Sequence, residues 1–341
     1  MAMNRRGFLM ALPVLTAAGL ACTPAADQGG FAYRELAKNQ ATSGRKETIL
    51  VFMPDTTQTR EVWSGMRDEL GEEFNLVAVE VRGRGASEPI AEGMRRHRPS
   101  VVVLMNNPTV AGYREYQQKA VDKNFPPALI VMTSFLEGAS MGVSAASGIS
   151  YEVPLITVVT NLRKLMSSTI DRVGVVARAP LTRFVQRQAA LARREQIAVD
   201  VEYVSVNPNP SELKRALRQL KSRVGALWIL NDDRLLTRNL IASAWLPALD
   251  ERPWVPSIVG AASLVSAAHS FGTFAVLPDH AALGVQTANR IFDIADNDWQ
   301  LPDGPQVELP LSTTTTIDLV QARERFALRE DALAQVDRIL K

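Results

Sequence analysis

Two series of alternating strand-like and helix-like segments, on either side of residues 127–177, constrain the fold of this chain more than any other feature. Short apolar runs such as 48–53 and 101–105 in the first half, and 173–177 and 226–230 in the second, have the length and composition of buried parallel strands. Segments with apolar residues at helical spacing separate them. Strands that alternate with helices twice over predict an α/β fold with two doubly wound parallel-sheet lobes joined at a crossing.

The expected elements follow one another in a regular order. A last extended run is expected over the threonine-rich residues 307–317, Ser211 is expected to cap one helix, and Asp279 is expected to cap another. The expected strands are 48–53, 76–79, 101–105, 128–133, 173–177, 199–204, 226–230, 255–259 and 273–277, and the main expected helices are 60–70, 89–97, 113–122, 153–166, 184–194, 236–246 and 280–294.

Residues 1–22 at the amino terminus have the features of an export signal. Two arginines, Arg5 and Arg6, precede an apolar run that is too short to span a bilayer and that ends at Cys22. The Arg-Arg-x-Phe-Leu pattern resembles a twin-arginine signal, and Cys22 resembles the lipidated cysteine of a bacterial lipoprotein, although Gly19 stands where that motif prefers leucine. The alternative is a plain cleaved signal with an incidental cysteine. Either way we expect a protein of the periplasm or cell envelope, with residues 23–46 as a polar tether.

Composition excludes several classes of function. Removal of residues 1–21 takes away two arginines, so the formal net charge of +2 falls to zero. The remainder has no run of five basic residues, so nucleic acid is not expected as a partner. Cys22 is the single cysteine, which excludes a disulfide within the chain and a thiolate metal site. The three histidines are scattered, and neither a metal nor a cofactor is expected.

Polar residues that follow the expected strands are the candidates for ligand binding. In open parallel sheets, ligands bind outside the carboxyl ends of the strands, where loops and helix N-termini present polar groups. A zwitterion would suit them, with Arg178 on its carboxylate and Asp232 on its ammonium group. The alternative is that each is an ordinary turn or capping residue. The candidates are Asp55, Thr56, Thr57, Asn106, Asn107, Thr133, Ser134, Arg178, Thr182, Asn231 and Asp232.

A catalytic alternative comes from residues 138–142, which fit the G-x-S-x-G pattern of a nucleophile elbow. Ser140 as nucleophile, Asp232, and either His269 or His280 would stand in the order found in α/β-hydrolases. The elbow needs a strand that runs directly into it, but residues 135–137 intervene, and the segment after the serine is rich in glycine and serine and poor in helix formers. A hydrolase is therefore the less favoured hypothesis.

Several motifs resemble those of a known family. Val224-Gly-Ala-Leu-Trp-Ile-Leu-Asn-Asp232 is similar to a signature strand, and Pro278-Asp-His-Ala-Ala-Leu-Gly284 to a "P-D-Y-x-x-L-G" motif. Residues 317–328 are similar to a closing "I-N-x-x-x-A-x-x-L-G-L" motif, and 148–150 to a "G-V-S" at the crossing. In this order the chain resembles substrate-binding proteins of bacterial ABC transporters, of the type that includes receptors for tryptophan and other aromatic amino acids.

The resemblance implies a type I periplasmic-binding fold, in which two lobes joined by three hinge strands close on a small ligand. The lobes would be 47–151 plus about 279–300, and 152–278 plus about 301–330. The implied function is a non-enzymatic receptor that delivers a small molecule, such as an amino acid or aromatic compound, to a membrane permease. A ligand-sensing subunit for a membrane signalling partner is the alternative. Loops such as 178–182 depart from the family's pattern, so the ligand is left open.

Overall fold

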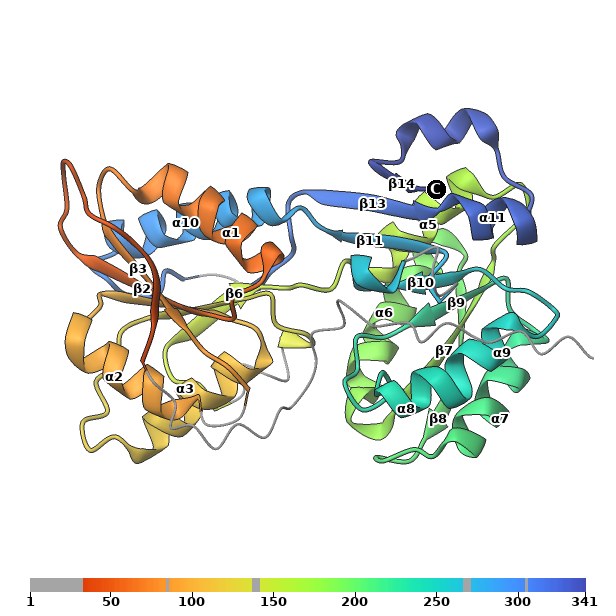
Figure 1. Ribbon diagram of the computed structural model, residues 1–341, viewed down its shortest axis with the longest axis horizontal. Coiled ribbons are helices and arrows are strands. Elements are labelled where there is room, and N and C mark those ends of the chain that lie inside the picture. The colour runs from red at the N-terminus through yellow and green to blue at the C-terminus, as the bar shows by residue number, and fades with distance from the viewer. Residues whose placement is uncertain (1–32, 84–85, 137–141, 266–270, 304–305) are drawn as a thin grey trace, which may run out of the picture.

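The protein folds into two lobes, each built on a seven-stranded sheet (Figure 1). The computed structural model describes residues 33–83, 86–136, 142–265, 271–303 and 306–341. The expected α/β fold with two sheet lobes is confirmed. The export signal with Cys22, and the hydrolase candidates Ser140 and His269, lie outside the described residues.

The first lobe has the strand order β1-β3-β2-β4-β5-β6-β12, all parallel except β1, which runs antiparallel to β3. Apolar residues alternate between the two faces, so that Ile49 and Val51 pack under α1 and α10 while Leu50 and Phe52 pack under α2 and α3. The strands are β1 (Glu35–Asn39), β2 (Thr48–Met53), β3 (Asn75–Glu80), β4 (Val101–Met105), β5 (Ala128–Val131), β6 (Ala146–Ile149) and β12 (Val307–Glu308), and the helices are α1 (Thr57–Leu70), α2 (Ser87–His97), α3 (Asn107–Lys119) and α10 (His280–Asp296).

The second lobe has the order β14-β13-β11-β10-β9-β7-β8, with β13 antiparallel to β11 and the other pairs parallel. Its strands are β7 (Arg172–Arg178), β8 (Ala198–Val204), β9 (Ala226–Ile229), β10 (Ser257–Val259), β11 (Phe274–Pro278), β13 (Thr313–Asp318) and β14 (Arg338–Leu340). Its α-helices are α5 (Leu155–Leu165), α6 (Thr182–Ala192), α7 (Pro210–Lys221), α8 (Arg238–Leu240), α9 (Leu246–Asp250) and α11 (Leu319–Arg325). Short helical turns of other types are η1 (Ala179–Leu181), η2 (Arg193–Glu195), η3 (Ile241–Trp245), η4 (Ala262–Leu264) and η5 (Glu330–Gln335).

Helix α10 packs on the first lobe although it directly follows β11 of the second lobe in sequence (Figure 1). Its Gly284 lies against Gly65 of α1, and a Cβ on Gly284 would come within 2.3 Å of the Val62 carbonyl oxygen. A Cβ on Gly65 would come equally close, 2.3 Å, to the Ala281 carbonyl oxygen. Only glycine at both positions allows the two helices to approach this closely.

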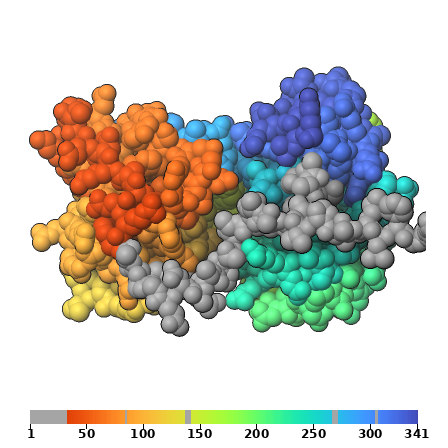
Figure 2. Space-filling model, viewed as in Figure 1, coloured from red at the N-terminus to blue at the C-terminus, as the bar shows by residue number. Residues whose placement is uncertain are grey.

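The chain passes between the lobes at three places within the described residues, namely 150–154, around Asp279, and 309–312. Two backbone hydrogen bonds join these crossings: Ser150 N–H donates to the Glu308 carbonyl at 2.8 Å, and Asp279 N–H donates to the Ser312 carbonyl at 3.0 Å. The space-filling view shows a notch between the two lobes at its upper edge (Figure 2). The crossings therefore lie together and form a hinge between the lobes.

Several expected boundaries differ from the structure. Residues 35–39, expected in the tether, form β1, because they pair with β3 and because the Tyr33 hydroxyl lies 2.7 Å from His97 Nε2 of α2. The extended run 307–317 divides between two sheets: β12 joins the first lobe, so the expected second-lobe segment 301–330 begins too early. The second sheet also continues past residue 330 to β14.

The two capping predictions had different outcomes. Asp279 caps α10, as expected, by accepting a hydrogen bond from Ala282 N–H at 3.0 Å. Ser211 does not cap α7, so that prediction was wrong: Asn209 accepts from Glu212 N–H at 3.0 Å, and Pro210 occupies the first helical position. Proline is well suited to that position because it has no N–H to satisfy.

Candidate functional site: a crevice at the hinge

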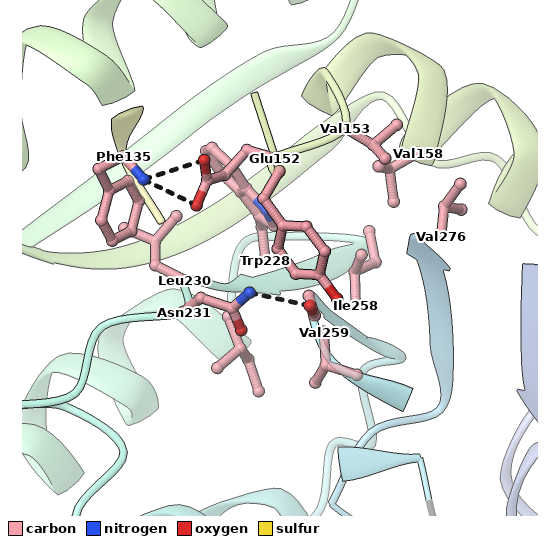
Figure 3. Close-up of a pocket in the computed structure, with 13 residues that line it drawn as sticks. Phe135, Glu152, Val153, Val158, Trp228, Leu230, Asn231, Ile258, Val259 and Val276 are labelled. Atoms are coloured by element: carbon pink, nitrogen blue, oxygen red, sulfur yellow. Dashed lines mark hydrogen bonds between the residues drawn. The ribbon is translucent and has the colours of Figure 1, made fainter. Parts of the chain in front are cut away.

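A small cavity lies where both lobes meet the hinge, at the carboxyl ends of β9 and β10 (Figure 3). Its volume of about 30 Å³ admits only one or two water molecules. Phe135 comes from the loop after β5 of the first lobe, and residues 151–153 come from the first crossing. The lining is Phe135, Tyr151, Glu152, Val153, Val158, Trp228, Ile229, Leu230, Asn231, Ile258, Val259, Gly260 and Val276. The position agrees with the rule that ligands bind at the carboxyl ends of parallel strands.

Three aromatic rings connect the first lobe to the core of the second. The Phe135 ring meets the Phe184 ring edge-on, with centroids 5.0 Å apart and planes at 74°. Phe184 in turn lies 5.8 Å from the ring of Trp228, which is buried on β9. Pairs in this range of geometry stabilise by about 0.5–1.5 kcal/mol beyond the burial of their area. Phe135 is thus a first-lobe residue that packs into the second lobe.

The loop that carries Phe135 is strained. Phe135 has φ of 55° and Met132 has φ of 54°, both in the left-handed region that residues other than glycine rarely adopt. Each such residue costs about 1–2 kcal/mol. The Phe135 N–H donates to both carboxylate oxygens of Glu152, at 3.0 Å each, which offsets part of that strain (Figure 3).

Glu152 is the ionisable group in the cavity lining with the strongest perturbation. Burial raises the pKa of its carboxyl from 4.5 to about 7, and hydrogen bonds from the Phe135 backbone and the Ser134 side chain lower it in part. No lysine, arginine or histidine within the described ranges forms an ion pair with Glu152. A carboxylate held among apolar side chains without a cation is costly, and it is stabilised by any positive group that comes close.

A second polar group links the hinge to the first lobe. The Tyr151 hydroxyl lies 3.0 Å from His280 Nε2, and the two rings stack with planes at 4°. His280 Nδ1 lies 2.9 Å from a carboxylate oxygen of Glu61 on α1. Burial, together with the charges of Glu152 and Glu61, raises the pKa of Tyr151 to about 12, so that its hydroxyl stays protonated at neutral pH.

Asn231 and Gly260 form the polar floor of the cavity. The Asn231 Nδ2 donates to the Gly260 carbonyl at 2.8 Å (Figure 3). A Cβ at residue 260 would lie 2.6 Å from that nitrogen, so only glycine lets the amide reach the backbone there. In the part of the chain that the structure describes, the amide oxygen of Asn231 has no hydrogen-bond donor, and it is left as an acceptor.

The candidates in the first lobe are mostly engaged in local structure. Thr56 caps α1 by accepting from Thr59 N–H at 3.3 Å, and Thr57 is the first residue of that helix. Asn106 caps α3 in the same way, accepting from Thr109 N–H at 3.1 Å. The remaining partners are Asp55 with Arg60 at 2.6 Å, Ser134 N–H with Asn107 Oδ1 at 2.8 Å, and the buried Thr133 hydroxyl with the Val131 carbonyl at 3.3 Å. These contacts match the alternative interpretation as turn and capping residues.

The charged candidates in the second lobe pair with each other. Arg178 binds Asp232 through two hydrogen bonds of 2.7 Å, and the Asp232 side chain is 1% exposed. The two charges that were expected to hold a zwitterion are therefore paired with each other in this structure. Thr182 donates to the Ala179 carbonyl at 2.8 Å. Of the predicted residues, Asn231 lines the cavity.

The main lining groups, Phe135, Tyr151, Glu152 and Trp228, were not among the predicted residues. Tyr151 and Glu152 directly follow the "G-V-S"-like motif at the crossing, and Trp228 lies within the signature-like strand. The position at the crossing could have identified Tyr151 and Glu152, and the signature-like strand could have identified Trp228.

The geometry that a hydrolase needs is missing from the described residues. Asp232 binds Arg178, whereas His280 binds Tyr151 and Glu61, so these two triad candidates do not pair with each other. Nor does any group of three or more histidine, cysteine, aspartate or glutamate residues in the described ranges have the arrangement of a metal site. None of the described helices has the length and apolar character needed to cross a membrane.

No protein-family model and no curated protein matches the chain. Among solved structures, it is similar to the ligand-free, open form of a substrate-binding protein with adhesive properties from Clostridium difficile, at 12% identity and a TM-score of 0.61, covering 86% of this chain and 99% of that one. It is also similar to an ABC domain in complex with L-Trp from Streptococcus pneumonia, at 16% identity and a TM-score of 0.56, covering 87% and 100%. A third similar structure is that of a XylFII–LytSN complex, at 8% identity and a TM-score of 0.51, covering 80% of this chain and 97% of that one.

These similarities extend over nearly the full length of each solved structure, so they concern the whole two-lobe arrangement. The chain has the type I periplasmic-binding fold, as its sequence motifs predicted.

Proposed function

We propose that this protein is an exported solute receptor. It captures a small organic molecule in the crevice between its lobes and delivers that molecule to the membrane permease of an ABC importer. The observation that carries the proposal is that the crevice is lined at once by the first lobe (Phe135), the hinge (Glu152) and the second lobe (Trp228). A ligand bound there touches both lobes, and it therefore favours one relative position of the lobes over others.

The fold neighbours support this proposal. Two of the solved structures are described as a substrate-binding protein and as an ABC domain bound to L-Trp. In the described residues the crevice also lacks a paired nucleophile and base, which suits binding without chemistry. A lipid anchor on Cys22, behind a twin-arginine-like signal, would hold the receptor in the cell envelope beside its permease.

The cavity in its present form is too small for a solute. Ligand pockets commonly enclose about 300–1,000 Å³, whereas this cavity measures about 30 Å³. Ligand entry therefore requires the first-lobe loop with Phe135 to withdraw from the second lobe. The three hinge crossings allow such a movement without breaking either sheet.

A thermal-shift screen of the processed protein, from residue 23 onward, tests the proposal against amines, amino acids, aromatic acids, nucleosides and short peptides. A true ligand at hundredfold excess over its dissociation constant stabilises by about 2.7 kcal/mol. The matched control is Trp228→Ala, which should melt cooperatively but lose the shift. No shift with any class, together with turnover of ester substrates that Ser140→Ala abolishes, would contradict the proposal and favour the hydrolase.

A signalling role is the second candidate, because one fold neighbour is described as XylFII in complex with LytSN. In that case the ligand-bound protein presents its new lobe arrangement to a membrane sensor instead of a permease. Pull-down from solubilised membranes, with and without ligand, separates the two: recovery of permease subunits supports uptake, and recovery of a sensor kinase supports signalling.

A further inference from the structure

We infer that the ligand is an organic cation, a protonated amine whose ammonium group binds Glu152 and whose hydrocarbon part packs against Trp228 and Phe184. This inference rests on the proposed function and names the class of solute that the crevice selects.

The charges in the crevice favour a cation. Among the described residues that line the crevice, Glu152 is the one acid, and none is a lysine, arginine or histidine. Arg178, which could have received a carboxylate, binds Asp232 through one edge of its guanidinium, Nε and Nη2, and its Nη1 donates to the Val206 carbonyl at 3.2 Å. An anion would therefore meet a carboxylate with no opposing positive group, and a zwitterion would leave its own carboxylate unpaired in an apolar wall. Both arrangements are costly in a site of low polarity.

The hydrogen-bonding groups of the crevice point to the same class. An ammonium group carries only donors, up to three of them. The lining offers acceptors that suit it: the Glu152 carboxylate, the amide oxygen of Asn231 and the Tyr151 hydroxyl oxygen. The Asn231 amide nitrogen is already used by the Gly260 carbonyl, at 2.8 Å, so its acceptor end is the one left for a ligand.

The rings of the crevice suit an organic rather than an inorganic cation. Trp228 lines the crevice together with Val153, Val158 and Val276. The Phe184 ring, which the Phe135 ring contacts, lies behind them, 5.8 Å from Trp228 between ring centroids. Aromatic faces attract ammonium groups, by about 0.5–2 kcal/mol depending on exposure, and they also bury the attached hydrocarbon. Carboxylate oxygens and a hydrocarbon wall side by side match a molecule with one charged end and one apolar end.

Phe135 shows how such a molecule would fit, because it already places an apolar ring and a hydrogen-bond donor, its backbone N–H, in the crevice. Its ring lies 5.0 Å from Phe184, and its N–H donates to both oxygens of Glu152 at 3.0 Å. The ligand's ammonium takes the place of this N–H, and its hydrocarbon takes the place of the ring. Withdrawal of Phe135 also allows its backbone, with φ of 55°, to leave the strained left-handed region.

The groups around Glu152 determine whether the affinity for a ligand rises or falls with pH. It is flanked by the Ser134 side chain and the Phe135 backbone, and by Tyr151, behind which lie His280 and Glu61. The Arg178–Asp232 pair beside Asn231 is neutral overall. A cation binds the ionised form of Glu152, and burial holds the pKa of that carboxyl at about 7 in the free protein. Affinity for a cation must then rise with pH, and affinity for an anion must fall.

Calorimetry on the processed protein tests the inference with three compounds that share a phenyl ring: phenethylamine (a cation), phenylalanine (a zwitterion) and hydrocinnamate (an anion). Aliphatic, quaternary and polyvalent amines extend the cation set. We expect at least one cation to bind, at least tenfold more tightly than any anion, and about tenfold more tightly at pH 8 than at pH 6, as the titration of a single group near pH 7 requires.

Two variants with opposite effects separate binding from misfolding. Glu152→Gln should weaken cation binding at least tenfold and remove its pH dependence, whereas Glu330→Gln, on an exposed carboxylate, should change neither. Phe135→Ala removes the internal occupant and should tighten cation binding several-fold. Circular dichroism melting confirms that each variant folds.

The inference is overturned if every cation fails while another class binds, or if affinity rises as the pH falls; the receptor function would survive either result. It is also overturned if Glu152→Gln folds and binds the cation with wild-type affinity and pH dependence. If no compound of any charge binds, the proposed function fails as well.

Discussion

The edges of the two lobes that face the hinge occupy equivalent positions but use their residues differently. At the first-lobe edge, polar side chains such as Thr56 and Asn106 hydrogen-bond within their own lobe and begin helices. At the second-lobe edge the wall is apolar, with Trp228 and Val259, and it faces a single carboxylate, Glu152. The polar residues after the first-lobe strands therefore serve to start the next helix, whereas the crevice that we propose as the ligand site lies where a carboxylate meets an apolar wall.

Among the variants that test this difference between the two edges, Asp232→Ala in the second lobe is expected to lower the unfolding free energy the most. The change leaves Arg178, only 13% exposed, without its carboxylate. Loss of one partner of a buried ion pair costs about 3–5 kcal/mol of unfolding free energy. Urea denaturation measures this loss. The double variant Arg178→Met with Asp232→Leu should recover most of it, and a single variant as stable as the wild type would show that the pair is not buried in solution.

Glu152→Gln should change the pH dependence of stability in the absence of ligand. The pKa of Glu152 in the folded protein, about 7, lies above its ordinary value of 4.5, so the native state holds a proton that the unfolded state releases between these values. Wild-type stability therefore falls as the pH rises from about 4.5 to about 7, by up to about 3 kcal/mol, and the neutral amide of the variant carries no such penalty.

Unfolding free energies of the wild type and Glu152→Gln, measured between about pH 5 and pH 8, check this sign. The unfolding free energy of the variant should rise relative to that of the wild type as the pH increases. If the unfolding free energy of the variant minus that of the wild type stays constant or falls as the pH increases, Glu152 ionises normally and the second-lobe wall does not desolvate it.

Asn106→Ala tests two contributions of Asn106 to the stability of the first-lobe edge: its side-chain cap on α3 and its positive φ. Asn106 has φ of 90°, and its side chain accepts from Thr109 N–H. Alanine loses the cap, worth about 1 kcal/mol, and tolerates the positive φ poorly, which adds about 1 kcal/mol more. Asn106→Gly is the matched control, because it loses the cap but keeps the backbone freedom. We expect the alanine variant to be the less stable of the two by chemical denaturation.

Thr56→Ala should have the smallest effect. Removal of the hydroxyl that caps α1 costs about 1 kcal/mol, since Thr59 N–H loses its 3.3 Å partner. Ligand affinity, measured by calorimetry with whichever solute the screen identifies, should not change. A tenfold loss of affinity with unchanged stability would instead place Thr56 in the binding site and remove the contrast between the two edges.

The sequence predicted the fold well because the strands that matter most are local, contiguous apolar runs. Residues 48–53 and 101–105 are buried throughout or nearly so, as their composition indicated. Three strands were missed. β1 and β14 are short and partly exposed, and β6 is a mostly buried run of small residues that lacks the apolar composition of a strand. All three are strands because distant strands pair with them. Such pairing is not encoded in local pattern.

The site was predicted less well, for a physical reason. The rule that ligands bind at strand ends located the correct edge and found Asn231. It could not show that Arg178 and Asp232 lie within hydrogen-bonding distance across the sheet, at 2.7 Å. Nor could it show that Phe135 would cross from one lobe into the other, because that contact depends on how the lobes meet at the hinge.

The packing of α10 on α1 has a consequence for the biogenesis of the protein. The apolar face of α1, with Val62 and Met66, packs against the first sheet and against α10, and α10 begins at residue 280. The second sheet in turn gains β13 and β14 only from residues 313–340. Both lobes therefore depend on segments that come late in the described sequence: the first lobe on α10, and the second lobe on β13 and β14. A chain cut before residue 280 would therefore leave the cores of both lobes unfinished.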